Sequence, residues 1–209
     1  MRVSDTHRVL FVHVQKTGGS TLDRMIDEEV GDARKVKGGC TRHTGFARLI
    51  EVEPELAGYW SCGFVRNPFA RMVSWWSMAV RFGARLDAGG RVAKRKMRRH
   101  PETWEPLVRY RDDFNRFVLE GTQEVPRLSM PQISLLTAGE RRVDFVGRTE
   151  NLVADANVLR ERLGLEPVDE LPRRNPTSHG HYSDYYDDAT RQRVAEVYAP
   201  DIEAFGYTF

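Results

Sequence analysis

Apolar and polar residues follow one another along this chain in an order that predicts strands followed by helices. The apolar runs Arg8–Val14, Tyr59–Val65 and Val143–Val146 have the length of buried strands. Each run ends in a polar turn, and a segment with apolar residues at helical spacing follows. This alternation predicts an α/β fold with a mostly parallel sheet, in which ligands bind where the strands end. We therefore expect the turns after Val14, Val65 and Val146 to share one site.

The same pattern predicts where the helices lie. They are expected from a Ser20 or Thr21 cap to about Val30, over Gly45–Ile50, from Pro68 onward, over Asp112–Leu119, over about Leu152–Leu163, and from Asp187 or Asp188 to about Phe205. The length of 209 residues favours a single domain, 1–209. Residues 83–110 differ in character, because six of the nine residues from Arg91 to Arg99 are Lys or Arg. We expect a basic, lid-like excursion there.

Composition narrows the class of protein. Hydrophobic residues make up 40% of the chain and aromatic residues 10%, which favours a packed core over disorder. The net charge of +2 is weak support for nucleic-acid binding. The longest apolar run near the N-terminus, Val9–Val14, is shorter than a membrane span or a signal-peptide core. We expect a cytoplasmic protein without stable membrane insertion.

The metal-binding residue types show no recognisable pattern. Cys40 and Cys62 form no C-x-x-C motif, so two free thiols are expected. The six histidines have no zinc-ligand spacing. The sequence therefore predicts no metal site.

The stretch KTGGST, Lys16 to Thr21, has the composition of an anion-binding loop between a strand and a helix. Its glycines allow a tight turn, and amides at the start of the helix can point at a phosphate. Several residues could contribute, by backbone amide, hydroxyl or charge: Lys16, Thr17, Gly18, Gly19, Ser20 and Thr21. The Walker form G-x-x-x-x-G-K-[ST] places its lysine after the glycines, whereas Lys16 precedes them here. The alternative is a plain turn with a solvated lysine.

The turn after the second predicted strand could hold a second anion. In FVRNPFARMVS, Arg66 ends the strand and Ser74 lies two helical turns further on. Arginine grips phosphate with two hydrogen bonds, and a helix serine can donate to the same group. Alternatively, Arg66 caps the helix and Arg71 pairs with an acid.

These two segments, followed by VDFVGRTENL, resemble the sulfotransferases that use 3′-phosphoadenosine 5′-phosphosulfate (PAPS). The likeness is to the carbohydrate type, including heparan-sulfate 6-O-sulfotransferases and small bacterial members, and it spans about Val9 to Asn151. It implies a three-layer α/β/α fold similar to that of P-loop nucleotide kinases. It also implies transfer of a sulfuryl group from PAPS to an acceptor hydroxyl, which releases 3′-phosphoadenosine 5′-phosphate (PAP) without a metal.

The resemblance assigns roles to these residues. The loop Lys16 to Thr21 would bind the 5′-phosphosulfate, and Lys16 would stabilise charge on the bridging oxygen. Arg66 and Ser74 would bind the 3′-phosphate. Arg148 either completes the nucleotide pocket or pairs with an acid such as Glu150. Gln132, in SMPQISLL, resembles a Pro-Gln element near the substrate cleft.

The transfer needs a general base, and His43 is the candidate because related enzymes place a histidine in this part of the chain. His43 would then contact the acceptor, whereas the other possibility is an exposed loop histidine. His13 is expected to be structural. Other groups that could serve as the base are Glu51, Glu53, Glu55, His179 and His181.

The acceptor is expected to be a small molecule or a glycan, with a carbohydrate hydroxyl as the first choice and no nucleic acid. The basic run Arg91–Arg99 is open to three interpretations: a solvated lid, an electrostatic guide for PAPS or an anionic acceptor, or a nucleic-acid contact. Two other functions remain open for the whole chain. One is a non-catalytic nucleotide-binding protein of the same fold, and the other is a P-loop-type small-molecule kinase.

Overall fold

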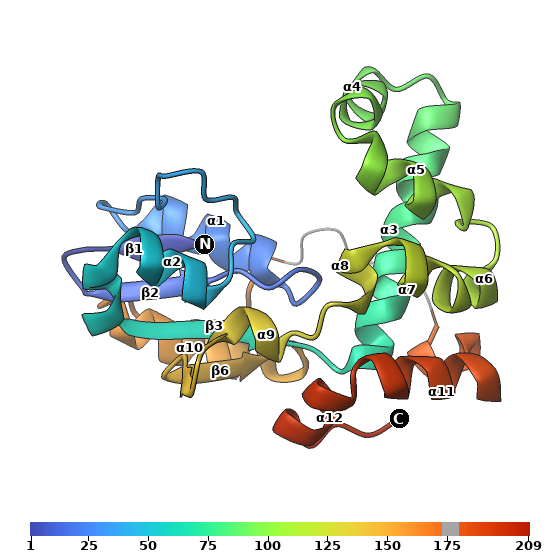
Figure 1. The fold of residues 1–209 in the computed structure, drawn as a ribbon. Helices are drawn as coiled ribbons and strands as arrows, with labels where there is room; N and C mark the ends of the chain where they lie inside the picture. Colours follow the sequence, from blue (N-terminus) through green and yellow to red (C-terminus); the bar gives the residue numbers. More distant parts are fainter. Residues whose placement is uncertain (173–179) are drawn as a thin grey trace. The chain divides into compact units, whose positions relative to one another are not determined.

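The computed structural model describes residues 1–172 and 180–209, and these form two compact units (Figure 1). The first unit contains residues 1–66 and 132–172, and the second contains residues 67–131 and 180–209. The chain therefore leaves the first unit after Arg66 and returns to it at Gln132. That the two units act as one sulfotransferase domain over residues 1–209 stays a prediction.

The first unit is built on a four-stranded sheet. Its order is β1 (Arg2–Ser4), β2 (Val9–Val12), β3 (Trp60–Val65) and β6 (Phe145–Arg148). The pairs β2–β3 and β3–β6 are parallel, and only β1 runs antiparallel to its neighbour. The α/β class and the mostly parallel sheet are thus confirmed, with β1 as a strand that the sequence pattern did not predict.

Helices cover both faces of this sheet. Helices α1 (Gly19–Glu29) and α10 (Leu152–Arg162) share a hydrophobic core with Phe11 and Phe64. On the opposite face, a Cβ on Gly63 would lie 2.3 Å from Leu136 of α9 (Ile133–Leu136), and α9 contacts α2 (Phe46–Val52). The first unit therefore has three layers, as the family resemblance implies.

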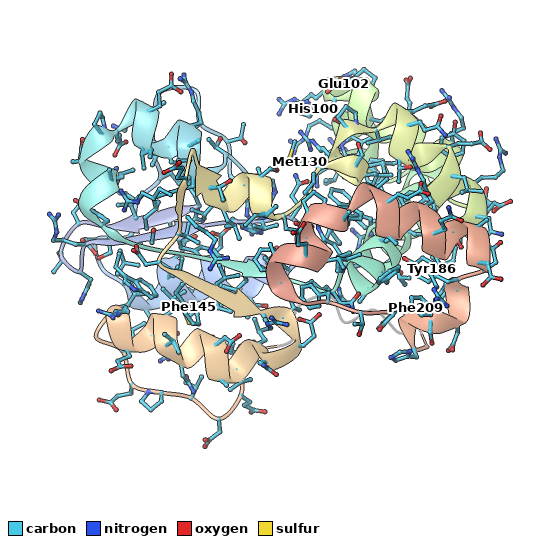
Figure 2. All side chains as sticks on the ribbon, turned by 60° about the horizontal axis from the view of Figure 1, so that its bottom comes forward. His100, Glu102, Met130, Phe145, Tyr186 and Phe209 are labelled. Carbon is cyan, nitrogen blue, oxygen red and sulfur yellow. The ribbon has the colours of Figure 1, made fainter. Side chains whose placement is uncertain are left out.

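Short elements complete the first unit. They are η1 (Pro54–Gly58), the antiparallel pair β4 (Thr137–Ala138) and β5 (Arg141–Arg142), and η2 (Thr149–Asn151). The strand β6 begins two residues later than the sequence predicted. The reason is that the Asp144 carboxylate accepts hydrogen bonds from the Ser61 amide and hydroxyl, both 2.7 Å, so ladder pairing starts with Phe145 opposite Cys62. Phe145, which is labelled in Figure 2, stacks on Trp60 according to their ring geometry, with centroids 6.0 Å apart and planes at 18°.

The second unit is helical and centres on α3 (Pro68–Asp87). Pro68 occupies the first turn, where its missing N–H costs nothing, and the Asn67 side chain caps the helix by accepting from the Phe69 amide at 2.9 Å. The helices that contact α3 include α5 (Pro101–Arg109), α6 (Phe114–Leu119) and α11 (Asp188–Val197). The shared core includes Met72, Val73, Phe117, Val194 and Tyr198.

Other helices of this unit are α7 (Gly121–Glu124), α8 (Pro126–Ser129), η3 (Tyr182–Tyr185) and α12 (Ala199–Phe205). The single C-terminal helix predicted from the sequence is wrong, because α11 ends before Tyr198 and α12 follows. Pro200 lies in the first turn of α12 and has no N–H with which to continue α11. Phe209, after α12, lies edge-on to Tyr186 (Figure 2).

The basic run forms helix α4 (Arg91–Arg99), which contacts α3 and α5. Ala93 is buried, while every Lys and Arg of α4 is exposed. No helix in residues 1–172 or 180–209 is both long and apolar enough to cross a membrane.

Candidate functional site

The turns that follow the three parallel strands lie together in the first unit. The Thr149 hydroxyl after β6 donates to the Val65 carbonyl at the end of β3, at 2.9 Å. A Cβ on Gly18 would lie 3.3 Å from Leu152 and 3.9 Å from Thr149. The loop after β2 therefore packs against the turn after β6, at the carboxyl ends of the strands, where α/β proteins bind ligands.

The loop from Lys16 to Thr21 curls tightly before helix α1. Gly18 is the residue before the helix and has φ +77°, and Lys16 also has a positive φ of +70°. A left-handed conformation is rare for lysine and costs roughly 1–2 kcal/mol. The Thr21 amide donates to the Gly18 carbonyl at 2.9 Å, which leaves the amides of Gly19 and Ser20 at the open first turn of α1. Such amides can bind an anion.

The three hydroxyls of the loop have different surroundings. Thr17 is buried, and its Oγ1 donates to the Val14 carbonyl at 3.0 Å, so this hydroxyl braces the loop from within. Ser20 is exposed, and its Oγ accepts from Arg42 Nη2 at 3.1 Å, which leaves the hydroxyl proton able to donate. The Thr21 hydroxyl lies 3.5 Å from the Pro172 carbonyl, at the outer limit of a hydrogen bond.

His13 lies beneath the loop and is only 3% exposed. A Cβ on Gly19 would come within 2.5 Å of Cδ2 and Nε2 of His13, so this position has no space for a side chain. His13 Nδ1 donates to Asp23 Oδ2 at 2.7 Å. The expectation that His13 is structural agrees with this buried position.

Two residues that the sequence reading missed complete the cluster. Asp23 of α1 is 2% exposed, and its Oδ2 also accepts from Arg42 Nε at 2.5 Å. The only sequence signal was weak: Asp23 shares a helix face with Gly19, Leu22 and Ile26, so a carboxylate occupies an apolar face. Arg42 gave no signal because the segment from Gly31 to Thr44 reads as a polar loop.

His43 lies beside His13. The two rings are 4.6 Å apart and nearly perpendicular, and His43 Nδ1 donates to the His13 carbonyl at 3.2 Å. Because a carbonyl only accepts, Nδ1 carries the proton and Nε2 of a neutral His43 is left with its lone pair. Burial, followed by repulsion from His13, lowers the pKa of His43 to about 3. His43 is therefore neutral at pH 7.

The buried cluster around Asp23 is charged in a defined way. Burial by itself would raise the pKa of Asp23, but the hydrogen bond from His13 and the charges nearby, including Arg42, bring it well below its usual range. Burial lowers the pKa of His13, against the pull of Asp23. At pH 7 the site thus combines an ionised Asp23 and a positive Arg42 with two neutral imidazoles.

Gln132 holds the end of β3. Its Oε1 accepts from the Arg66 amide at 2.9 Å, and its Nε2 donates to the Arg66 carbonyl at 2.8 Å. Gln132 is 0% exposed, and its contact with the acceptor stays a prediction. The structure gives Gln132 a position from which it fixes the main chain of Arg66. At the end of β6, the Arg148 amide donates to Asp155 at 2.5 Å.

Three of the alternative bases have other partners, Glu51, Glu53 and His181. Glu51 forms an ion pair with Arg48 at 2.8 Å, and Glu53 forms one with Arg34 at 2.8 Å. His181, in the second unit, lies 2.7 Å from the Ser183 hydroxyl. His179 lies outside the described residues.

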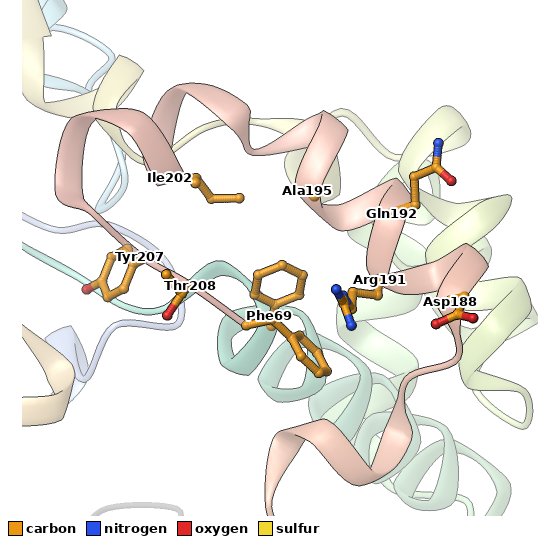
Figure 3. Close-up of a pocket in the computed structure, with 9 residues that line it drawn as sticks. Phe69, Asp188, Arg191, Gln192, Ala195, Ile202, Tyr207 and Thr208 are labelled. Carbon is orange, nitrogen blue, oxygen red and sulfur yellow. The ribbon is translucent and has the colours of Figure 1, made fainter.

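Ser74 belongs to the second unit, where it is 6% exposed on α3. This unit also has an open pocket of about 520 Å³ along α11, α12 and the chain after them (Figure 3). Its lining is mainly apolar, with Phe69, Ile202 and Phe209 beside Arg191. None of the site residues expected from the sequence lines it.

The candidate site thus consists of a buried histidine–carboxylate cluster under a glycine loop, on a parallel α/β sheet. The chain belongs to the sulfotransferase family, whose model matches residues 1–208. This confirms the family resemblance seen in the sequence.

Among curated proteins, the chain is similar to carbohydrate sulfotransferase 14 of Homo sapiens, at 26% identity over 98% of this chain and 59% of that protein. It is similarly related to carbohydrate sulfotransferase 14 of Danio rerio, at 25% identity over 98% of this chain and 61% of that protein. The chain thus spans about three fifths of the length of these relatives. The carbohydrate type of the resemblance is confirmed, while the likeness to 6-O enzymes in particular stays a prediction.

Proposed function

We propose that this protein transfers the sulfuryl group of PAPS to an acceptor hydroxyl, with a carbohydrate or glycoconjugate as the acceptor. Family membership supports sulfuryl transfer. The observation that carries the choice of donor is the loop after β2, with Lys16 in front of a left-handed Gly18 and two amides at the start of α1. Such a loop suits a phosphosulfate approached from the strand side.

In this proposal the chain binds the donor at the carboxyl end of the sheet. The amides of Gly19 and Ser20, with the Ser20 hydroxyl, hold the 5′-phosphate. The Lys16 ammonium stabilises the negative charge that develops on the bridging oxygen as its bond to sulfur breaks. The Thr17 hydroxyl supports the loop through its hydrogen bond to the Val14 carbonyl, and the proposal gives it no direct contact with the donor.

His43 is the proposed general base. Its Nε2 accepts the proton of the acceptor hydroxyl while the acceptor oxygen forms its bond to sulfur and PAP leaves. The hydrogen bond from Nδ1 to the His13 carbonyl supports this role, because it leaves the lone pair on Nε2. A pKa of about 3 makes His43 a weak base that is always available at neutral pH.

Arg66 and Ser74 are the proposed ligands of the 3′-phosphate. For Arg66, the fixed main chain at the end of β3 supports the role, since Gln132 pairs with both its amide and its carbonyl. The proposal for Ser74 rests on the sequence resemblance alone. Arg148 is proposed to complete the nucleotide pocket from the end of β6, and Gln132 acts by positioning Arg66.

Binding of PAP provides the direct test. PAP should raise the thermal unfolding temperature more than ATP does, and it should do so in the presence of EDTA, because we propose no metal. Lys16→Ala and Arg66→Ala should each weaken the effect of PAP. Labelled PAPS with a panel of glycan acceptors then tests transfer.

Other results would assign another function. Stabilisation by ATP with Mg²⁺ and not by PAP would favour a small-molecule kinase. PAP binding without transfer to any acceptor would favour a non-catalytic nucleotide-binding protein. The cytoplasmic location expected from the sequence is a separate proposal, to be tested by cell fractionation of the native protein.

A further inference from the structure

Asp23 is a buried carboxylate that has no role in the proposed reaction as described so far. It lies one turn inside α1, on the helix face that also buries Leu22 and Ile26, and it is 2% exposed. Carboxylates are almost never buried to this extent unless they are paired. Its partners therefore indicate what it does.

One oxygen of Asp23 joins the strand end to the loop segment that carries His43. Oδ2 accepts from His13 Nδ1 at 2.7 Å, and it accepts from Arg42 Nε at 2.5 Å. Since an ionised carboxylate only accepts, His13 Nδ1 must carry its proton, and the 3.2 Å approach of Arg42 Nε to His13 Nδ1 is a contact between two donors to that oxygen. The ring of His13 is thereby fixed in orientation.

Each of these two partners continues to a residue of the proposed site. Arg42 Nη2 donates to the Ser20 hydroxyl at 3.1 Å, in the first turn of α1. The His13 ring fills the space beside Gly19, and the His13 carbonyl accepts from His43 Nδ1. The loop from Lys16 to Thr21, called the donor loop below, and the proposed base His43 are thus both held by the Asp23 carboxylate, each through no more than two contacts.

We propose that Asp23 is a positioning residue that holds the donor loop and His43 in one arrangement, through Arg42 and His13. This inference rests on the proposed function for the roles of the loop and of His43. It goes beyond that function by stating that donor binding and proton removal share one support. Asp23 itself touches neither substrate.

Asp23→Asn is the primary test, because it keeps the shape and removes the charge. Asp144→Asn is the matched control: it is also a carboxylate of the first unit with two hydrogen bonds, but it lies at the start of β3 and β6, at the other end of the strands from the loop. The readouts are PAP affinity, kcat and KM with PAPS and an acceptor, and the imidazole ¹⁵N shifts of His43, which report its tautomer.

Asp23→Asn should weaken PAP binding and lower kcat by about tenfold to a hundredfold, as expected when reacting groups lose their alignment. The His43 signal should change from a fixed Nδ1–H tautomer to a mixture. Asp144→Asn should leave all three readouts as in the wild type. If Asp23→Asn keeps the tautomer, the PAP affinity and kcat while losing only thermal stability, the proposal is overturned.

Arg42→Lys keeps the test open if Asp23→Asn does not fold. The Arg42 side chain is 43% exposed, and lysine keeps the charge but cannot bridge Asp23 and Ser20 with two nitrogens. It should weaken PAP binding by about tenfold, as loss of one charge-assisted bond predicts, and an unchanged PAP affinity would overturn the proposal.

The two proposals can fail separately. If the wild type binds no PAP and transfers no sulfuryl group, the proposed function is wrong. The ¹⁵N shifts of His43 in Asp23→Asn then still decide whether Asp23 orders this histidine: loss of the fixed tautomer supports the positioning role and its retention overturns it.

Discussion

The ring of His13 occupies the space in which a side chain at Gly19 would have to lie. A Cβ at position 19 would come within 2.5 Å of two atoms of a ring that is itself held by Asp23. The second glycine of the loop is therefore required by packing beneath the loop, whereas Gly18 is required by its positive φ. The two adjacent positions therefore require glycine for different physical reasons.

Gly19→Ala tests this packing. The new methyl group must displace His13 or move the start of α1, which should cost about 1–3 kcal/mol of unfolding free energy. It should also weaken PAP binding, because the amides move with the helix. Gly31→Ala is the control, since a Cβ there meets no atom within 4 Å. Equal stability of the two variants, measured by urea unfolding, would contradict the close packing.

Lys16 allows charge and backbone strain to be separated. Lys16→Ala and Lys16→Gly both remove the ammonium, and both should lower sulfuryl transfer by about a hundredfold or more if Lys16 stabilises the leaving group. Only glycine relieves the φ of +70°, so Lys16→Gly should be about 1 kcal/mol more stable than Lys16→Ala. Thermal unfolding of the two variants without ligand makes the comparison. A less stable glycine variant would show that the left-handed conformation costs nothing here.

The pKa of His43 predicts how stability changes with pH. An unfolded histidine titrates near pH 6.5, while folded His43 has a pKa of about 3. Between these values the unfolded state binds the extra proton, so the unfolding free energy should fall as the pH drops from about 6.5 toward 3. His13 acts in the same direction because burial lowers its pKa as well.

The variant His43→Asn separates the contribution of His43 to the pH dependence of stability from that of His13. The asparagine amide can still donate to the His13 carbonyl but does not titrate. Urea unfolding between neutral and mildly acidic pH should show a shallower loss of stability for this variant than for the wild type. The rate constant kcat/KM of the wild type should show no acid limb near pH 6.5, provided that the protein stays folded. An acid limb at that pH would assign the proton transfer to another group.

Gln132 gives a prediction about the second anion site. Gln132→Ala leaves the amide and the carbonyl of Arg66 without this side-chain partner, which should cost about 1–3 kcal/mol of stability. PAP binding should weaken because Arg66 is no longer held. Gln123→Ala, which removes an exposed amide on α7, is the control and should change neither. Calorimetric titration with PAP distinguishes the two variants.

Helix α4 can be tested by changing its charge. Arg91, Lys94, Arg95 and Arg98 are exposed, and no ion pair of theirs occurs among the described residues. Joint replacement of these four residues by glutamine should leave the unfolding temperature unchanged. The variant Arg116→Gln on α6 is the control for the loss of a positive charge outside α4. If α4 guides an anionic substrate, the replacement should lower kcat/KM at low salt and flatten its salt dependence. An unchanged salt dependence would leave α4 as a solvated helix, and salt-sensitive oligonucleotide binding by the wild type would favour nucleic acid.

The sequence predicted the parallel strands and the helices α1, α2, α3, α6 and α10 because their apolar residues follow simple periods. It did not predict α4 and α5, which lie in the segment 83–110 that was expected to be a basic excursion. It failed where a single side chain decides the local structure. Asp144 delays the start of β6, and Pro200 divides the last helix into two. The strand β1 was missed because only three residues, Arg2–Ser4, form it, with a charged residue first.

For the candidate site, the sequence predicted the residues of the loop but not their support. Asp23 and Arg42 come from a helix face and a polar segment, 19 residues apart, and neither belongs to a motif. Their importance depends on side-chain contacts across the unit, which no local pattern encodes. The burial that sets the pKa of His43 is equally invisible in the sequence.

The amide pair between Gln132 and Arg66 has a consequence for how this family can vary. It fastens the point where the chain leaves the first unit to the point where it returns, so the intervening residues 67–131 start and finish at one closed junction. The entropic cost of such a closed loop rises only slowly with its length. Relatives could therefore lengthen, shorten or rewrite this stretch while the strand ends keep their geometry, which makes the junction a natural boundary for exchanging segments between family members.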